Sequence, residues 1–376
     1  MKEYTSLPIA SPLTVSREPP NSRMTNCAFV IPGDINLPTG GYAYDRRVLA
    51  LLPAAGVPTQ HVSLPGSFPA PSAADLDATE KLLAALPADT ILLFDGLAYG
   101  ALPKPVVDRI RQPIVALCHH PLALETGTSP ERQKELAALE TAALARAAHV
   151  IVSSPMTRAT LAADFGVPVA KIAVAEPGTD RAGRVTPWTG GRLELLAVGS
   201  VIPRKGYDVL VEALAPLQPA ASGIDWHLRI AGSMALSPDT ATALQQRITA
   251  HDLTTAITLL GAVEHAALER HYAGAHIFVM SSLYEGYGMV LAEAMARGLP
   301  IVCTTGGAAA DLVPDGAALK VAPGDAQALR HALQRAMSEP ALLAELAAGS
   351  YAAGQKLPSW EDAARIIAEV VKRVAS

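Results

Sequence analysis

The stretch SSLYEGYGMVLAEAMARGLPIV, residues 281–302, decides how the rest of the chain is interpreted. It follows an apolar run and begins as a loop that contains Glu285, Gly286 and Gly288. Apolar residues at helical spacing come next, and a glycine and a proline close that segment before a second apolar run begins. The pattern predicts a strand, a glycine loop, a helix and a strand, in that order.

This order predicts an anion site at the start of the helix. Free backbone N–H groups and the positive end of the helix dipole point at a ligand there, and phosphate is the usual guest. Glu285 and Glu293 accept hydrogen bonds only, so they suit the hydroxyl groups of a sugar. Taken alone, the two glutamates are equally well explained as solvated charges, so the rest of the chain has to decide.

Length and composition set the limits. With 376 residues, 50% of them hydrophobic and 5% aromatic, the chain is long enough for two domains of helices packed on buried strands. A net charge of -5 argues against nucleic acid as a partner. The cysteines, Cys27, Cys118 and Cys303, lie far apart and are interpreted as buried thiols in a reducing compartment.

Strand-like and helix-like segments alternate along the chain, which predicts an α/β protein with two doubly wound, Rossmann-like domains. The expected elements include a turn at Asp95 and Gly96 and a helix from Tyr207 to Leu217. The polar, turn-rich run at 179–191 is the expected linker. We expect a disordered leader at 1–23, a first domain at 24–182, a linker core at 183–191, a second domain at 192–358 and a final helix at 359–376. Ligands of such sheets bind at the carboxyl ends of the strands.

Cationic residues follow the first strand of the second domain. Gly199 ends that strand, and Arg204 and Lys205 come just before the next helix. An arginine offers a bidentate fork and a lysine a compact charge, which together suit a diphosphate. The ordinary alternative is a solvated turn, but the pair occupies the same edge of the sheet as the Glu285 loop, which favours a functional role.

The first domain offers two weaker signals. Gly40 and Gly41 stand between its first strand and first helix, where two glycines let the backbone approach a ligand or form an anion-binding nest, although a plain tight turn explains them too. His119 and His120 follow another strand, where a histidine can orient a hydroxyl or move its proton near neutral pH. The sequence leaves open which of the two faces the site.

Other chemistries are disfavoured. No G-x-G-x-x-G, P-loop or G-x-S-x-G motif follows a strand. The pair Asp75 and Asp77 resembles a metal-binding motif, but both residues fall in the first turn of an amphipathic helix, where carboxylates favour the helix dipole. We therefore expect no metal site there.

With these residues identified, the chain resembles the retaining glycosyltransferases of family 4, which have the GT-B fold with a central cleft between two domains. The Glu285 to Glu293 block in EGYGMVLAEAMARGLPIV matches the signature of that family, and the G-S-x-x-x-R-K-G run from Gly199 to Gly206 matches its second motif. The glycine pair at 40–41 and the EPGTD run at 176–180 are further similarities. Tyr287 stands where the family often has Phe, and Thr179 replaces a usual apolar residue.

The resemblance implies a nucleotide diphosphate sugar as donor and a carbohydrate or lipid-linked acceptor, with no metal or other cofactor. Arg204 and Lys205 would neutralise the diphosphate, Glu293 would take the ribose hydroxyls and Glu285 the donor sugar. Backbone groups of Gly288, Met289 and Val290 would support the phosphates, Gly199 and the pair Gly40 and Gly41 would line the donor site, and His119 would lie beside the sugar. The final helix would cross back to the first domain.

Three rival functions remain. A GT-B epimerase or hydrolase would release nucleotide without an acceptor, whereas a sugar-nucleotide-binding protein or an inactive homologue would bind without turnover. The chain has no signal peptide and no long apolar run, so we expect a cytoplasmic protein. Lys104, Arg109 and Arg111 could give it a weak peripheral contact with the inner face of a membrane, although so small a cluster is usually a solvated helix face. The nucleotide base, the sugar, the acceptor and the oligomeric state stay open.

Overall fold

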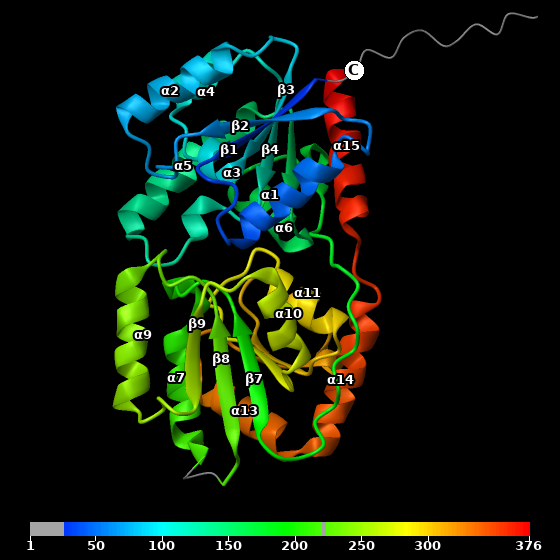
Figure 1. Cartoon of the computed structure of the whole chain (residues 1–376). Coiled ribbons are helices and arrows are strands. Elements are labelled where there is room, and N and C mark those ends of the chain that lie inside the picture. The colour runs from blue at the N-terminus through cyan, green and yellow to red at the C-terminus, as the bar shows by residue number, and fades with distance from the viewer. Residues whose placement is uncertain (1–25, 220–222) are drawn as a thin grey trace, which may run out of the picture.

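The computed structural model describes residues 26–219 and 223–376, so the expected leader at 1–23 lies outside the described residues. The chain forms two six-stranded parallel sheets, each flanked by helices, one above the other in Figure 1. The strand orders are β2-β1-β3-β4-β5-β6 and β12-β11-β10-β7-β8-β9. The predicted α/β class with two doubly wound sheets is therefore confirmed.

The first sheet forms because short, almost continuous apolar runs alternate with amphipathic segments, the pattern of strands buried on both faces. Every residue of β1 and β3 is buried. The elements of this domain are β1 (Cys27–Pro32), α1 (Gly40–Leu51), β2 (Thr59–Leu64), α2 (Ala73–Ala84), β3 (Ile91–Asp95), α3 (Gly96–Tyr99), α4 (Lys104–Arg109), β4 (Ile114–Cys118), α5 (Pro130–Arg146), β5 (His149–Val152), α6 (Pro155–Asp164) and β6 (Ile172–Val174).

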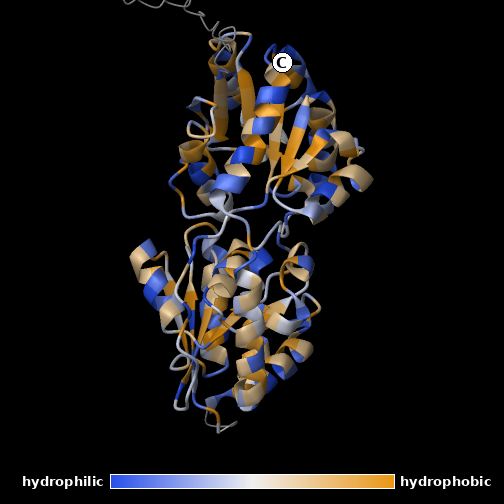
Figure 2. Cartoon of the chain, turned by 90° about the vertical axis from the view of Figure 1, so that its right-hand side faces the viewer, coloured by the Kyte–Doolittle hydropathy of each residue, from blue (hydrophilic) through white to orange (hydrophobic). Residues whose placement is uncertain are grey.

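The second sheet repeats this plan. Its elements are β7 (Leu193–Val198), α7 (Tyr207–Leu214), β8 (Trp226–Ala231), α9 (Pro238–Ala250), β9 (Ile257–Gly261), α10 (His265–Ala273), β10 (Ile277–Met280), α11 (Met289–Ala296), β11 (Ile301–Thr304), α12 (Ala309–Leu312), β12 (Ala318–Val321), α13 (Ala326–Ser338) and α14 (Pro340–Gly354). In Figure 2 the strands of both domains are coloured as hydrophobic and lie inside helices of mixed colour, as expected for buried sheets.

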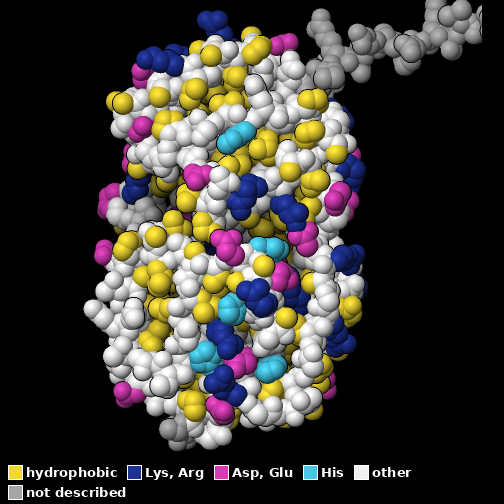
Figure 3. All heavy atoms as spheres, viewed as in Figure 1, with side chains coloured by type: hydrophobic (Ala, Val, Ile, Leu, Met, Phe, Trp, Pro, Cys, Tyr) yellow, Lys and Arg dark blue, Asp and Glu magenta, His cyan; other side chains and the backbone are white. Residues whose placement is uncertain are grey.

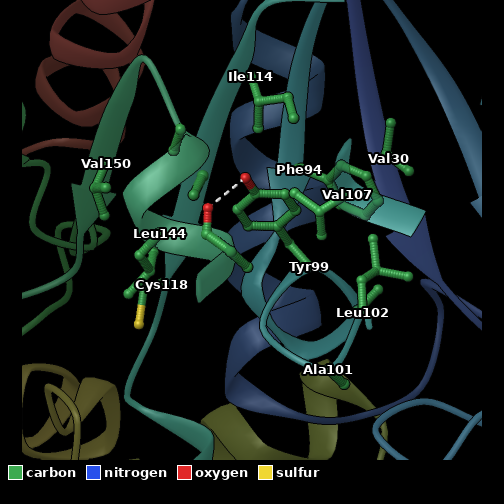
Figure 4. Packing of buried hydrophobic residues seen from close by; sticks show 14 of the residues in the cluster. Val30, Phe94, Tyr99, Ala101, Leu102, Val107, Ile114, Cys118, Leu144 and Val150 are labelled. Atoms are coloured by element: carbon green, nitrogen blue, oxygen red, sulfur yellow. Dashed lines mark hydrogen bonds between the residues drawn. The ribbon is translucent and has the colours of Figure 1, made fainter. Parts of the chain in front are cut away.

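The core of the first domain packs the helices tightly onto the strands. Tyr99 of α3 is fully buried, and its ring lies tilted against that of Phe94 of β3 with ring centroids 5.2 Å apart. Its hydroxyl donates to the carbonyl of Ala143 in α5 at 2.6 Å (Figure 4). The expected buried thiols are confirmed, because Cys27, Cys118 and Cys303 are all buried and free.

Helix α15 (Trp360–Ala375) lies beside the first domain, as Figure 1 shows, although it follows the second domain in sequence. Ser359 and Asp362 form a capping box at its start. Its apolar face joins the cluster around α1, where the ring of Trp360 lies edge-on to Tyr44 at 5.8 Å. The last helix thus fastens the end of the chain to the first sheet.

Three local predictions were wrong. The expected turn at Asp95 and Gly96 is the start of the short helix α3, because the Asp95 carboxylate caps it by accepting from the Leu97 N–H at 2.6 Å. Gly40 and Gly41 belong to the first turn of α1, after the cap Thr39, rather than to a loop. The helix expected over 207–217 is α-helical only to Leu214 and ends as a 3-10 turn that contains a proline.

The charged residues weighed in the sequence have structural partners. Asp75 forms a capping box with Ser72 at the start of α2, which is the structural role expected for it. Lys104 pairs with Asp108, and Arg109 pairs with Glu80. Among the described residues, no helix is both long and apolar enough to cross a membrane.

Candidate active site

The two sheets reverse their strand order at points that bear the predicted site residues. In the first sheet the reversal falls between β1 and β3, and in the second between β7 and β10. The first turn of α1, which follows β1, carries the pair Gly40 and Gly41, and the loop after β7 carries the run from Gly199 to Lys205. The loop after β10 carries Glu285. Such switch points form crevices where α/β sheets bind ligands.

The start of α11 offers the predicted anion site. Gly288 precedes the helix at φ 99°, a left-handed conformation that glycine adopts without strain. Leu291 and Ala292 donate their N–H groups back to the Gly288 carbonyl, whereas those of Met289 and Val290 have no partner among the described residues. Two free donors and the positive end of the dipole are therefore available for a phosphate.

Lys205 and Arg204 meet Glu285 across the second switch point. The Lys205 ammonium lies 2.6 Å from one Glu285 oxygen, and the Arg204 guanidinium lies 3.4 Å from the other. Burial raises the pKa of Glu285, but these two charges outweigh it and bring the pKa to about 2. Glu285 is therefore an ionised acceptor and cannot serve as an acid near neutral pH.

Hydrogen bonds from two serines and close packing at two glycines hold Lys205 and Glu285 in place. The Ser282 hydroxyl donates to Glu285 at 2.6 Å, and the Ser281 hydroxyl donates to the Lys205 carbonyl at 2.9 Å. A Cβ on Gly199 would lie 2.7 Å from the Lys205 side chain. Because glycine has no Cβ, the lysine side chain can pack over the end of β7. Gly206 has φ 58° and its Cβ position lies 2.4 Å from the Ser281 carbonyl. Glycine is required at both positions.

Arg204 also links the two domains. Its Nε lies 3.1 Å from Glu125 of the first domain, and its NH1 donates to the Tyr284 carbonyl at 2.8 Å. The other Glu125 oxygen lies 3.1 Å from the Nε2 of His120. Burial raises the pKa of Glu125, yet the contacts with His120 and Arg204 lower it overall. Sequence reasoning missed Glu125, which follows a strand end only after a short 3-10 turn.

The first-domain residues predicted for the site lie against the second domain. A Cβ on Gly40 would lie 4.0 Å from the Met289 sulfur, and one on Gly41 would lie 3.3 Å from the His119 ring. On the opposite side, a Cβ on Gly286 would lie only 2.5 Å from the His119 carbonyl. The structure therefore brings the glycine pair, His119 and the start of α11 together.

Glu293 is held one turn further along α11. The hydroxyl of Tyr272 in α10 donates to Glu293 Oε2 at 2.7 Å, and the Arg297 guanidinium lies 4.5 Å from the Tyr272 ring. Burial raises the pKa of Glu293, although Tyr272 and Arg297 oppose that rise. Arg297 is fixed in turn by Glu269 at 2.5 Å. Tyr272 and Arg297 belong to no motif, so nothing in the sequence pointed to them.

Two buried carboxyl groups stand behind His119. Its Nε2 lies 3.1 Å from Asp45 of α1 and 3.9 Å from Asp95 at the end of β3. One carboxylate oxygen of each aspartate and one ring nitrogen of His119 lie within 4.8 Å of one another, close enough to hold a metal ion. The sequence held one signal for Asp45, because it lies three positions before the buried Val48 on the inner face of α1.

Other polar features lie beside the linker and in the sheet of the second domain, and Arg297 and Glu269 join one of them to the surroundings of Glu293. A hollow of about 600 Å³ beside the linker is lined by Arg181, Arg184, Arg270 and Arg297, among others, and by none of the predicted site residues. Figure 3 shows cationic, acidic and histidine side chains mixed over the second domain. In the sheet of that domain Glu194 pairs with Arg229 at 2.5 Å and lies 3.4 Å from His227.

Two facing Rossmann-like domains with cations beside a helix start at their switch points define the GT-B class of glycosyltransferases. Residues 34–178 match the family model of the glycosyl transferase 4-like domain, and residues 180–353 match that of the glycosyl transferases group 1. The chain therefore belongs to the family 4 type of glycosyltransferases with the GT-B fold.

Similar proteins include sugar transferases. The lipopolysaccharide core biosynthesis mannosyltransferase LpsB of Rhizobium meliloti is 33% identical over 177 residues, which are 46% of this chain and 49% of that protein. The MMP alpha-(1->4)-mannosyltransferase of Mycolicibacterium hassiacum is 26% identical over 336 residues, 82% of this chain and 76% of that protein. For LpsB and for the D-inositol 3-phosphate glycosyltransferase of Pseudarthrobacter chlorophenolicus, the matched part of the chain spans about half the length of the relative.

Solved structures share the fold. Sucrose-phosphate synthase from Thermosynechococcus elongatus has a TM-score of 0.75 at 21% identity, with 93% of this chain and 98% of that chain covered. HepE from Anabaena, in complex with UDP and glucose, has a TM-score of 0.70 at 18% identity, with 92% and 99% covered.

Proposed function

We propose that this protein is a retaining glycosyltransferase that moves a sugar from a nucleotide diphosphate sugar to an acceptor hydroxyl in polysaccharide, glycolipid or glycoconjugate synthesis. The observation that carries the proposal is the convergence of Arg204 and Lys205 on Glu285 beside the free N–H groups of α11. Membership of the family supports it, as do HepE, which binds UDP and UDP-glucose, and the mannosyltransferases among the relatives.

The cations act on the diphosphate. Without a ligand, Glu285 and Glu125 balance the charges of Arg204 and Lys205. A diphosphate placed between these cations and the start of α11 gains charge-assisted hydrogen bonds from both. This arrangement stabilises the negative charge that develops as the nucleotide leaves, so the proposed mechanism uses side chains and a helix terminus where other enzymes use a metal ion.

The two glutamates take separate tasks. Glu285, ionised and aimed at the cations, accepts hydrogen bonds from hydroxyl groups of the donor sugar. Glu293 has one oxygen fixed by Tyr272, which leaves the other for a ribose hydroxyl. Gly40, Gly41 and Gly199 supply backbone that comes close to the donor because no side chain intervenes.

The transfer step exchanges one bond to the anomeric carbon for another. The bond to the phosphate oxygen breaks, the acceptor oxygen forms the new glycosidic bond on the same face, and the acceptor proton passes to the departing phosphate. Glu285 is not assigned as a nucleophile, because its carboxylate is engaged by two cations and Ser282. The protein positions the two substrates and stabilises the leaving group.

The test measures nucleotide release from a panel of nucleotide diphosphate sugars with and without candidate carbohydrate and lipid-linked acceptors. We expect release that depends on an acceptor, a product that retains the anomeric configuration, and loss of turnover in Arg204→Ala and Lys205→Ala. Release without an acceptor would identify a hydrolase or epimerase, and binding without turnover would identify a sugar-nucleotide-binding protein. Normal turnover by both variants would contradict the proposal.

A further inference from the structure

The cluster of Asp45, Asp95 and His119 contains two deeply buried carboxyl groups, although one would be enough to form a hydrogen bond with the histidine. Asp45 is 0% exposed and Asp95 is 2% exposed, and they come from two elements, α1 and β3. Asp45 Oδ1 faces His119, while its Oδ2 is buried and has no hydrogen-bond partner among the described residues. A buried oxygen without a hydrogen-bond partner destabilises the folded protein. Protonation of this carboxyl group, or a neighbouring group that donates a proton to it, would remove that cost.

Burial and like-charge repulsion disfavour ionisation of both carboxyl groups at once. Burial raises the pKa of Asp45 to about 7, and burial together with the charge of Asp45 raises that of Asp95. The other titratable or charged groups around the pair include Arg46, Tyr42 and Tyr44 of α1 and the thiol of Cys118. One proton held between Asp45 and Asp95 removes a like-charge repulsion and gives the unpartnered oxygen a function.

The same contacts select one form of the imidazole. Burial lowers the pKa of His119, although Asp95 opposes this, so the ring is neutral near pH 7. A neutral ring whose Nε2 faces a carboxyl oxygen at 3.1 Å carries its proton on Nε2. Nδ1 then becomes the acceptor, and it has no partner among the described residues. The side chain of His119 is 21% exposed, and Tyr44 packs edge-on against it.

We propose that Asp45 and Asp95 are positioning residues, a carboxyl pair that shares one proton, fixes the proton of His119 on Nε2 and leaves Nδ1 to accept a hydrogen bond from a hydroxyl of the transferred sugar. Asp95 is itself held by the Leu97 N–H at 2.6 Å. The contact with the sugar rests on the proposed function, whereas the form of His119 is a property of the free protein.

The first experiment reads the histidine directly. The protein is labelled with ¹⁵N-histidine, His119 is assigned from the spectrum of His119→Gln, and long-range ¹H–¹⁵N spectra are recorded without any substrate. We expect His119 as the Nε2–H form in the wild type and a mixture of forms in Asp45→Ala. Asp45→Asn keeps an oxygen for Nε2–H and restores the single form. Asp89→Asn, an exposed carboxyl of the same domain, is the matched control.

The shared proton has its own signature. As the pH rises through about 7, Asp45 ionises while the charge of Asp45 keeps the remaining proton on the pair, so the His119 Nε2 resonance shifts in the wild type but not in Asp45→Asn. An Nδ1–H form in the wild type, or an unchanged single form in Asp45→Ala, overturns the positioning role. Metal analysis of the purified protein is the second check, because a stoichiometric divalent cation that Asp45→Ala loses would replace the proton and also overturn the proposal.

The second experiment tests the link to the sugar. We expect Asp45→Ala to lower kcat/KM for the sugar nucleotide by about 2- to 10-fold, the value of one hydrogen bond, while the Kd of the nucleoside diphosphate without its sugar stays unchanged. An equal loss of affinity for the nucleoside diphosphate contradicts the assignment of His119 to the sugar. If no transfer is found with any donor, the proposed function fails, and the NMR result still decides the role of the pair.

Discussion

Glu285 is a carboxylate that its surroundings keep ionised inside the protein. Its side chain is 9% exposed, yet Lys205 and Arg204 hold its pKa at about 2, below the ordinary value of 4.5. A depressed pKa in the folded state means that the charged form stabilises folding. This contribution is present above pH 4.5 and disappears as the pH falls from 4.5 to 2.

The first prediction follows from that shift. We expect the difference in unfolding free energy between the wild type and Glu285→Gln to fall by about 3 kcal/mol as the pH drops from 4.5 to 2, from the pKa difference. Denaturant unfolding at a series of pH values measures it. Glu345→Gln, an exposed glutamate of α14, should show no such trend, and a flat Glu285→Gln difference would refute the ion-pair account.

Tyr272 gives the second prediction. Removing its hydroxyl in Tyr272→Phe frees the Glu293 carboxylate from its only side-chain donor among the described residues. We expect the affinity for the nucleotide of the donor to fall several-fold and stability to fall by about 1 kcal/mol, one buried hydrogen bond. Tyr99→Phe removes a comparable bond far from Glu293 and should cost stability without any change in nucleotide affinity, measured by titration calorimetry (Figure 4).

At the scale of single residues, the sequence predicted the residues that motifs carry and missed those that only packing brings close. Arg204, Lys205 and Glu285 fall at strand ends, so their convergence followed from the order of elements. Glu125 and Tyr272 reach the same region from a 3-10 turn and from a helix face. No local pattern encodes such long-range contacts.

At the scale of elements, α11 depends on one backbone angle. Gly288 at φ 99° starts the helix with its N–H groups facing the switch point, and a Cβ there would lie 3.1 Å from Leu291. A non-glycine residue in this left-handed region costs about 1 to 3 kcal/mol. The start of α11 would move to relieve that strain.

The third prediction is therefore that Gly288→Ala lowers stability by about 1 to 3 kcal/mol and weakens binding of the nucleoside diphosphate, because the phosphate donors shift. Gly183→Ala, at a glycine of ordinary φ with open space around it, should leave both unchanged. Denaturant unfolding and calorimetry measure the two effects. Wild-type affinity in Gly288→Ala would show that the helix start does not hold the phosphates.

Helices and strands were predictable here because buried parallel strands are almost continuously apolar and caps mark the helix starts. Ser154, Ser359 and Asp325 each cap the helix that follows. The short helix α3 was not predictable, because whether Asp95 turns the chain or caps a helix depends on the packing of Tyr99 against α5.

At the scale of the whole molecule, the two domains meet through their backbones as well as through Glu125 and Arg204. The Gly286 Cβ position lies 2.5 Å from the His119 carbonyl and 3.1 Å from the His120 side chain. Thr157 of α6 also reaches the Gly286 carbonyl at 3.5 Å. Two similar domains and a linker were predictable from the sequence, but the distance between the domains depends on such contacts and could not be predicted.

The fourth prediction tests this contact. In Gly286→Ala the new methyl group meets backbone of the other domain, so we expect the domains to separate and the radius of gyration from X-ray scattering to increase. Sugar transfer should be lost while circular dichroism of the helices stays unchanged, because neither core is touched. Gly316→Ala, in open space, is the control. An unchanged radius with full activity would mean that the domains are not required to meet here.

We assign binding of the diphosphate of a sugar nucleotide to Arg204, Lys205 and the start of α11. The most direct measurement is the unfolding free energy with uridine, guanosine or adenosine diphosphate added to the wild type, to Lys205→Met and to the surface control Lys81→Met. At about 100 times its Kd, one of these ligands should stabilise the wild type and Lys81→Met by about 2.7 kcal/mol and Lys205→Met far less. Equal stabilisation of Lys205→Met, or none of the wild type by any of the three, would contradict the account.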